Sequence, residues 1–405
     1  MTYCLEFPLC FCYNKHVFSL ILSPKKGPSE KGTGIKMTNS ELKKYNRSQV
    51  YQIIYEHRTI AKSSIASELH LSFPTISQLI TELEENGLVT KNGFFELTGG
   101  RKPIVFSCIS DARIALGIEL IKEHFQITAI DLYGEILYEE VYHIPFENKE
   151  SFFQQFGKIV GQFIISHNIP AEKILGIGIA LQGLVSFDKT AITYGAILKN
   201  NDLTIDRFKK YLDYPIMLIH DSEAAATDTL WNFSNIKDAL FLSLSRNIGG
   251  ALIINRQIHW GAFYPSGLFE HMTLIPNGAA CYCGKKGCLE AYCSVKNLLE
   301  GLSPTLDLFF AHLREGEQLH QIRWNQFLLN LSIAIDNLQM ALNCDVILGG
   351  HLAPYLNQED LNTLILLVTK DSAFNQGRPA IHLSKKSCIA RGAALYQIRQ
   401  FIDSV

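Results

Sequence analysis

Apolar residues in the N-terminal part of the chain repeat every three or four positions, which is the spacing of amphipathic helices. The pattern predicts one helix over Arg47–Glu56, with Val50, Ile53 and Ile54 on its inner face, and a second helix over Lys62–Leu69. A third helix follows after a tight turn. Three short amphipathic helices in a row predict a small helical domain.

The third helix has clear start and stop signals. Ser72 is a favourable N-cap, Pro74 is tolerated in the first turn, and Gly87 is typical of the residue that ends a helix. Two strand-like segments follow, Leu88–Thr90 and Phe94–Leu97, and the Asn-Gly pair between them is a strong hairpin signal. Together these elements indicate a winged helix-turn-helix, which begins near residue 42 and ends near residue 106.

One face of the third helix carries short polar side chains that can reach base edges and phosphates in a major groove. Arg101, after two glycines, is suited to a narrow minor groove. The predicted DNA-binding residues are Lys62, Ser72, Pro74, Thr75, Ser77, Gln78, Gly100, Arg101 and Lys102. The net charge of −2 gives no global attraction to DNA, so a winged helix that serves protein contacts only is the alternative. The gathering of Lys and Arg at helix starts and in the wing favours DNA.

The rest of the chain alternates strands and helices. Strands are predicted at Ile114–Leu120, Phe125–Asp131, Glu135–His143, Ile174–Ala180, Ile216–Ile219, Asp238–Ser245, Ala251–Asn255 and Val346–Leu348. Helices are predicted at Phe152–His167, Ser222–Trp231 and Ala390–Ile402. Two mixed sheets with helices fit an α/β architecture of two lobes with a cleft between them.

Composition narrows the class of protein. The 405 residues are 47% hydrophobic and 19% charged, which is typical of globular domains, and no apolar run approaches the length of a membrane span. The N-terminus lacks the pattern of a secretory signal, so we expect a cytoplasmic protein whose ten cysteines are thiols or metal ligands. Three segments are predicted: a leader over 1–36, a DNA-binding domain over 37–106 and an effector domain over 107–405. Our hypothesis for the leader is that translation starts at Met37; a disordered leader is the alternative.

Four residues have the spacing of a closed metal site. His271 is followed by Cys281, Cys283 and Cys288 in the segment CYCGKKGC. Three thiolates and one imidazole complete a tetrahedral Zn²⁺ shell, and the two glycines allow a tight loop around the ion. With no open coordination position, the zinc is expected to be structural. The alternative is three incidental thiols beside a core histidine.

These residues belong to a pattern that resembles the signature of the ROK family, which holds sugar-responsive repressors and sugar kinases. The signature runs through SGLFEH at 266–271 and CYCGKKGCLE at 281–290. GIGIA at 176–180, HDSEAAA at 220–226, LGGH at 348–351 and ARGAA at 390–394 resemble further family segments. The resemblance covers residues 42 to 405 and implies the two-lobed actin-like ATPase fold behind a winged helix.

The resemblance also raises the question of kinase activity. Asp221 matches the catalytic base of the family kinases, but their two glycine-rich phosphate turns are replaced here by Gly117–Lys122 and Ser245–Gly249. Larger side chains at these positions would crowd a triphosphate. We therefore expect no enzyme activity and interpret Asp221 as a vestigial base, which also suits the N-cap of the following helix.

The predicted effector-binding residues are His220, Asp221, His271 and Glu290. Leu268 replaces a glutamate that family sugar binders carry three residues before the histidine, which leaves the nature of the effector open. The leading hypothesis is a homodimeric repressor of carbohydrate genes that binds operator DNA and a sugar or sugar phosphate. The alternatives are a sugar kinase, and a repressor with a silent cleft that a sugar-transport protein controls.

Overall fold

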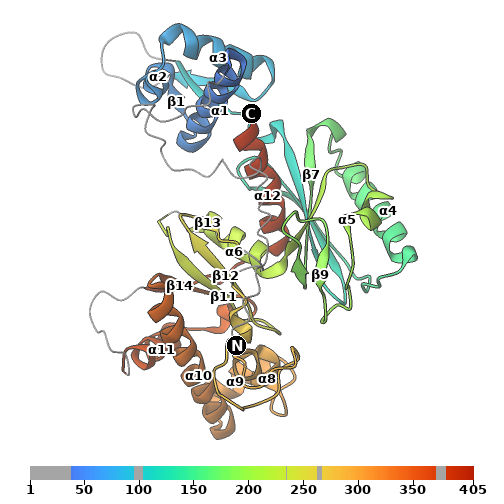
Figure 1. Ribbon diagram of the computed structural model, residues 1–405, viewed down its shortest axis with the longest axis vertical. Coiled ribbons are helices and arrows are strands. Elements are labelled where there is room, and N and C mark those ends of the chain that lie inside the picture. The colour runs from blue at the N-terminus through green and yellow to red at the C-terminus, as the bar shows by residue number, and fades with distance from the viewer. Residues whose placement is uncertain (1–37, 95–103, 234, 262–266, 371–379) are drawn as a thin grey trace, which may run out of the picture. The chain divides into compact units, whose positions relative to one another are not determined.

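The computed structural model describes residues 38–94, 104–233, 235–261, 267–370 and 380–405 (Figure 1). The described residues divide into two compact units, one formed by those up to 108 together with 402–405 and one formed by those within 109–401. The predicted leader at 1–36 lies outside the described residues. Within the described residues, no helix is both long and apolar enough to cross a membrane.

The first unit contains three helices and a small sheet. The helices are α1 (Asn39–His57), α2 (Lys62–Leu69) and α3 (Phe73–Glu85), and the sheet has the order β1 (Ile60–Ala61), β3 (Ile104–Cys108), β2 (Val89–Phe94). Fully buried apolar side chains from all three helices, among them Ile54, Ile65 and Leu83, form the core. The end of the chain joins this unit, where the side chain of Arg47 donates to the carbonyl of Val405 (3.3 Å) and that of Ser48 to the carbonyl of Asp403 (3.3 Å).

The structure corrects two predictions in this unit. The predicted hairpin turn at Asn92–Gly93 is wrong, because β2 runs through this pair, and Gly93 (φ +75°) lies at a shift in the register with β3. The partner of β2 is Ile104–Cys108, which the pattern analysis missed. Phe94 belongs to β2 itself, and residues 95–97 of the predicted second strand lie outside the described residues. Helix α1 begins eight residues before Arg47, since Thr38 and Glu41 form a capping box that the apolar spacing does not reveal.

The second unit has two five-stranded sheets. The first has the order β10 (Ile216–His220), β7 (Ile174–Leu181), β4 (Ile114–Leu120), β5 (Phe125–Ile130), β6 (Ile136–Tyr142); β4, β5 and β6 form an antiparallel meander, and β4, β7 and β10 are parallel. Helix α4 (Glu150–Ser166) covers one face of this sheet (Figure 1). Its buried side carries Phe152, Phe153, Phe156 and Phe163, which belong to the core of this lobe. The short helix α5 (Ile205–Lys209) and the hairpin of β8 (Leu184–Val185) and β9 (Ile192–Tyr194) complete this lobe.

The second sheet has the order β13 (Gln257–Ile258), β12 (Gly249–Ile254), β11 (Ala239–Ser243), β14 (Asp345–Gly349), β15 (Ile381–Leu383). Helices from the segments between β13 and β14 and between β14 and β15 pack on it: α7 (Glu290–Cys293), α8 (Val295–Leu299), α9 (Leu306–Glu315), α10 (Gln318–Leu342) and α11 (Gln358–Lys370). The strands and helices predicted from the sequence in this unit are confirmed within a few residues at each end.

Helices α6 (Asp221–Asn232) and α12 (Ile389–Ser404) pack closely through small residues. A Cβ at Gly117 of β4 would lie 1.7 Å from the carbonyl oxygen of Ala390, and one at Gly178 of β7 would lie 2.2 Å from that of Ala393. A Cβ at Gly392 would in turn lie 1.9 Å from the carbonyl oxygen of Ala224. These contacts explain the glycines on β4 and β7 and in α12, and they fix α12 between the first sheet and α6.

Candidate functional site

A cavity of about 280 Å³ lies in the second unit, and both lobes contribute to its wall. Its wall is formed by the end of β4, the segment after β7, the start of α6, the β11–β12 turn and the segment around η3 (Phe269–His271). The polar or ionisable residues that line it are Glu119, Gln182, Tyr194, His220, Asp221, Ser222, Ser243, Ser245, Arg246, Asn247, Glu270, His271, Tyr282, Cys283 and His351. A small cavity whose partly apolar wall carries this many polar groups suits a small ligand with several hydrogen-bonding groups.

His220 and Asp221 form a half-buried charged pair at the start of α6. The Nδ1 atom of His220 lies 2.8 Å from Oδ1 of Asp221, which also accepts the backbone N–H of Ser222 (2.7 Å). Burial opposes charge on both groups, but each holds the other charged, so the pKa of His220 is raised and that of Asp221 is lowered. The N-cap position belongs to His220, and Asp221, predicted to be the N-cap, is the first residue of the helix.

Glu270 is a cavity residue that the sequence analysis missed. Its side chain is 4% exposed, and its Oε2 atom has no hydrogen-bond partner among the described residues. Burial raises its pKa to about 7, and the charge of His220 opposes that shift. Leu268 also lines the cavity, so the chain has an apolar side chain at the predicted glutamate position and a carboxylate two residues later.

Glu119 lies at the end of β4, in the stretch that corresponds to the first phosphate turn of the kinases. Burial raises its pKa to about 7, and the nearby charge of Asp221 adds to the shift. Ile121 and Arg246 line the cavity at the two replaced turns, and Arg246 is exposed. The structure thus places side chains where the sequence analysis expected them to crowd a triphosphate.

Glu290, which was predicted to bind the effector, lies behind the cavity wall. One of its carboxylate oxygens accepts from the side chain of Asn247 (2.7 Å) and the other from the backbone N–H of Ile248 (2.7 Å). Both of these partners line the cavity. Glu290 therefore fixes the β11–β12 turn, while His220, Asp221 and His271 come together in the cavity lining.

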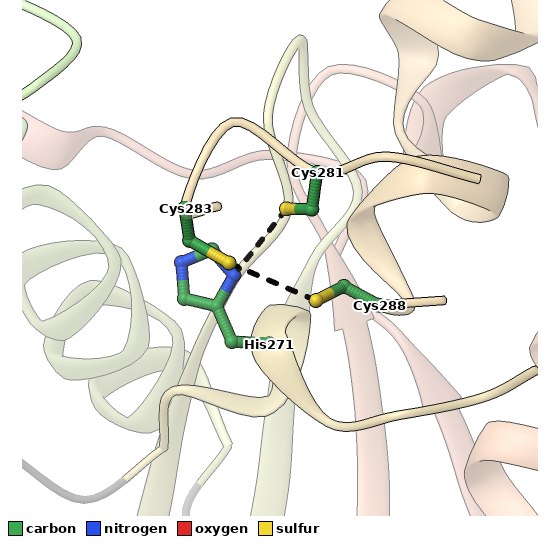
Figure 2. Close-up of side chains that lie close together, drawn as sticks. All are labelled: His271, Cys281, Cys283 and Cys288. Atoms are coloured by element: carbon green, nitrogen blue, oxygen red, sulfur yellow. Dashed lines mark hydrogen bonds between the residues drawn. The ribbon is translucent and has the colours of Figure 1, made fainter. Parts of the chain in front are cut away.

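The four predicted metal ligands converge beside this cavity (Figure 2). The ligand atoms of His271, Cys281, Cys283 and Cys288 all lie within 4.8 Å of one another. Sγ of Cys281 is 3.6 Å from Nδ1 of His271, and the Sγ atoms of Cys283 and Cys288 are 3.8 Å apart. Gly287 has φ +79°, and a Cβ there would lie 1.7 Å from the carbonyl of Ile275. This arrangement of sulfur and nitrogen donors can hold a metal ion.

The predicted DNA-binding residues of the first unit gather at the start of α3. The ammonium of Lys62 donates to Oγ of Ser77 (3.3 Å), and Oγ of Ser72 accepts the backbone N–H of Thr75 (3.3 Å). Pro74 and Gln78 are exposed on the same helix. Gly100, Arg101 and Lys102, the predicted wing contacts, lie outside the described residues.

A two-lobed unit of two mixed sheets with a polar cavity lined by both lobes is the architecture of the actin-like sugar kinase class. The ROK family profile matches residues 115–373, and the chain belongs to this family. The xylose repressor of Caldicellulosiruptor bescii is 22% identical over 358 residues, which cover 83% of this chain and 90% of that relative.

Two solved structures share the fold. A ROK family transcriptional regulator, described as a homologue of the Escherichia coli MLC protein, superposes with a TM-score of 0.74 and 17% identity over 90% of this chain and 97% of that chain. The ROK hexokinase of Thermus thermophilus superposes with a TM-score of 0.61 and 21% identity over 72% of this chain and 99% of the hexokinase.

Proposed function

We propose that this ROK protein is a sugar-responsive transcriptional repressor of carbohydrate genes that acts in the cytoplasm. One observation carries the proposal: the chain combines a small helical unit with exposed polar residues at the start of its third helix and a second unit with an acidic sugar-sized cavity. The full-length relationship to a xylose repressor supports this combination.

The first unit acts as a winged helix-turn-helix, with α3 in the major groove of operator DNA. Thr75, Ser77 and Gln78 lie on the first turns of α3, where recognition helices contact bases. Lys62 supplies a phosphate contact from the start of α2. Gly100, Arg101 and Lys102 are proposed to bind DNA from the wing, with Arg101 in the minor groove; all three lie outside the described residues. The DNA-binding domain is residues 37–106 and the effector domain begins at 107, while residues 402–405, predicted as the end of the effector domain, pack with the DNA-binding unit.

The effector is a sugar or sugar phosphate bound in the cavity. Carboxylate oxygens such as those of Glu119 and Asp221 accept hydrogen bonds from hydroxyls, and Arg246 and His220 add cationic groups to the same lining. Glu270 has an unpartnered carboxylate oxygen in this wall and supplies the acceptor that is missing at Leu268. Binding shifts the population towards a closed two-lobed state with a different operator affinity.

The protein has no kinase activity. A kinase has to admit the phosphates of ATP at the turns that here carry Glu119, Ile121 and Arg246. Asp221, the residue that matches the catalytic base, is held in an ion pair with His220.

A structural Zn²⁺ is bound by His271, Cys281, Cys283 and Cys288, because three thiolates and an imidazole suit a closed tetrahedral shell. The ion organises the loop that carries Tyr282 and Cys283 to the cavity. It thereby couples metal binding to the shape of the effector site.

The repressor is a homodimer that uses the outer face of α10. Every exposed residue of this 25-residue helix is uncharged. Five exposed apolar residues follow the heptad-like spacing of a helix–helix seam: Leu319, Ile322, Leu329, Ile333 and Met340. Leu342, at the end of the helix, is also exposed. Charge depletion with exposed apolar side chains is typical of an interface core. A two-fold dimer presents two DNA-reading units to a two-fold operator.

A ligand screen combined with DNA binding tests this function. The full-length protein is mixed with pentoses, hexoses, their phosphates and ATP, and thermal shift and operator binding are measured. Stabilisation by one sugar that also changes operator affinity is expected. ATP-dependent phosphorylation of any sugar contradicts the proposal. A DNA-binding protein that responds to no sugar, but to a sugar-transport protein, establishes the partner-controlled alternative.

A further inference from the structure

Two histidines and a glutamate meet at the junction of α9 and α10, in a part of the second unit that takes no part in the cavity. His312 lies in the last turns of α9, and Gly316 (φ +90°) ends that helix in a left-handed conformation. Glu317 occupies the N-cap position of α10, and His320 lies in its first turn. The sharp turn at Gly316 therefore brings together side chains from two helices.

The carboxylate of Glu317 and the imidazole nitrogens of His312 and His320 lie close together. Oε2 of Glu317 is 3.1 Å from Nδ1 of His320 and 3.8 Å from Nδ1 of His312, and the three atoms lie within 4.8 Å of one another. The two imidazole rings meet edge to face, with their centroids 4.9 Å apart. An ion 2.0–2.2 Å from each atom needs separations of roughly 3–3.5 Å, which small side-chain rotations supply.

The ring nitrogens that face this point are unsatisfied. Nδ1 of His312 and Nδ1 of His320 are both buried, and neither has a hydrogen-bond partner among the described residues. Buried polar nitrogens are normally paired, because an unpaired one costs about 1–3 kcal/mol. The 3.1 Å approach of Glu317 to His320 lacks the geometry of a hydrogen bond, so the carboxylate does not satisfy that nitrogen.

His320 is buried, and one of its ring nitrogens is hydrogen-bonded, as is usual for a histidine that binds a metal ion. The residue is 3% exposed and packs against Phe309, and its Nε2 atom lies 2.9 Å from Oγ of Ser303. When Nε2–H donates to Ser303, Nδ1 keeps its lone pair, and this lone pair faces the carboxylate of Glu317. Two acceptors repel at this distance unless a cation lies between them. A hydrogen bond on the other ring nitrogen is the usual support of a metal-bound histidine.

We propose that His312, Glu317 and His320 form a metal site that binds a divalent first-row transition ion such as Zn²⁺, Co²⁺ or Ni²⁺. Two imidazole nitrogens and one carboxylate oxygen are the donor set that these ions prefer over Mg²⁺ or Ca²⁺. Glu317 is half-exposed, so water completes the coordination shell. The bound ion joins the end of α9 to the start of α10 and restrains the turn at Gly316.

Metal counting on the full-length protein tests the site. The wild type and the variants His312→Gln and Glu317→Gln are dialysed against Zn²⁺, and bound metal is measured by atomic emission. The matched control is Glu315→Gln, an exposed carboxylate two residues away that is not part of the cluster. Both cluster variants are expected to bind one equivalent less than the wild type, and the control is expected to bind as much as the wild type.

Cobalt spectra identify which ion is lost. Co²⁺ at a site without sulfur gives only d–d bands, whereas Co²⁺ bound to cysteine adds thiolate charge-transfer absorption. The equivalent missing from the His312→Gln variant is expected to lack the charge-transfer band, and its loss is expected to reduce metal-dependent thermal stabilisation. The proposal is overturned if this variant binds as much metal as the wild type, or if the missing equivalent carries the thiolate band.

Discussion

At the scale of single residues, the cavity is distinguished by two carboxyl groups whose pKa is raised by burial. Glu119 and Glu270 both have a pKa of about 7. Glu119 lies in the stretch that corresponds to a phosphate turn of the sugar kinases, and Glu270 lies two residues after Leu268. The sequence comparison drew attention to Leu268 as a lost acceptor. The turn at Phe269–His271 places Glu270 in the lining of the same cavity, and we propose that its carboxylate takes the place of the lost acceptor.

Substitution of Glu270 tests whether this residue replaces the glutamate that is missing at position 268. Glu270→Gln keeps the size of the side chain and removes the charge, so sugar affinity is expected to fall by roughly tenfold to a hundredfold, the range of hydrogen bonds to charged groups. Isothermal titration calorimetry with the sugar found in the screen measures the change. Leu268→Glu combined with Glu270→Gln returns the carboxylate to the family position and is expected to restore binding. Wild-type affinity in the single variant refutes the role of Glu270.

Glu119 gives the protein a pH-dependent stability. Its pKa is about 7 in the folded state and 4.5 in the unfolded chain. At a pH between these two values, the folded protein therefore keeps a proton on Glu119 that the unfolded chain releases. Stability is therefore lost as the pH rises through this window, by up to ~3 kcal/mol for this group. Glu119→Gln is expected to lose less stability than the wild type between about pH 5 and about pH 8, as measured by urea unfolding.

The control for this experiment is Glu123→Gln, an exposed carboxylate in the β4–β5 turn. It is expected to follow the pH dependence of the wild type. An equal loss of stability in the Glu119 variant and the wild type would show that Glu119 is ionised at little cost in the folded protein.

At the scale of elements, the loop that carries the three cysteines is short and contains Gly284 and Gly287 with positive φ, and it is expected to depend on its metal. Chelation is expected to lower the unfolding temperature and to weaken sugar binding, because Cys283 and Tyr282 line the cavity. Cys283→Ser is expected to lose the ion, as measured by atomic emission. Cys344→Ser, a thiol outside the cluster, is expected to keep it. Retention of metal by the Cys283 variant contradicts the assignment.

The outer face of α10 is the element on which assembly depends. Ile333→Glu places a charge in the middle of the apolar row and is expected to convert the dimer to a monomer in sedimentation velocity experiments. The control is Ile165→Glu on α4, an exposed apolar residue away from that row. A dimeric Ile333 variant would show that the chains pair elsewhere.

At the scale of the whole molecule, periodicity and chemistry were predictable to different extents. The parallel strands β4, β7 and β10 were predicted from the sequence because they are buried along nearly their whole length and are therefore continuously apolar. The metal cluster was predicted because three of its ligands lie in one short loop and the fourth is a histidine shortly before it. The hairpin of the first unit was misread, because an Asn-Gly pair suits a bulge as well as a turn. Glu270 and the place of Glu290 behind the wall depend on the direction of side chains in a folded turn, which residue spacing does not encode.

The two units are expected to communicate through a coupling free energy that is the same in both directions. If the sugar weakens operator binding by a given factor, operator DNA has to weaken sugar binding by that factor, because the two routes to the ternary complex share their end points. A coupling of about 1–3 kcal/mol, which is five- to 150-fold, is typical. Calorimetric titration of the sugar into the free dimer and into the operator complex measures one factor, and fluorescence anisotropy of labelled operator with and without sugar measures the other. Equal factors above one establish a repressor released by its sugar, whereas equal factors below one make the sugar a co-repressor. A factor of one in both titrations means that the cavity binds sugar without controlling the DNA-binding unit.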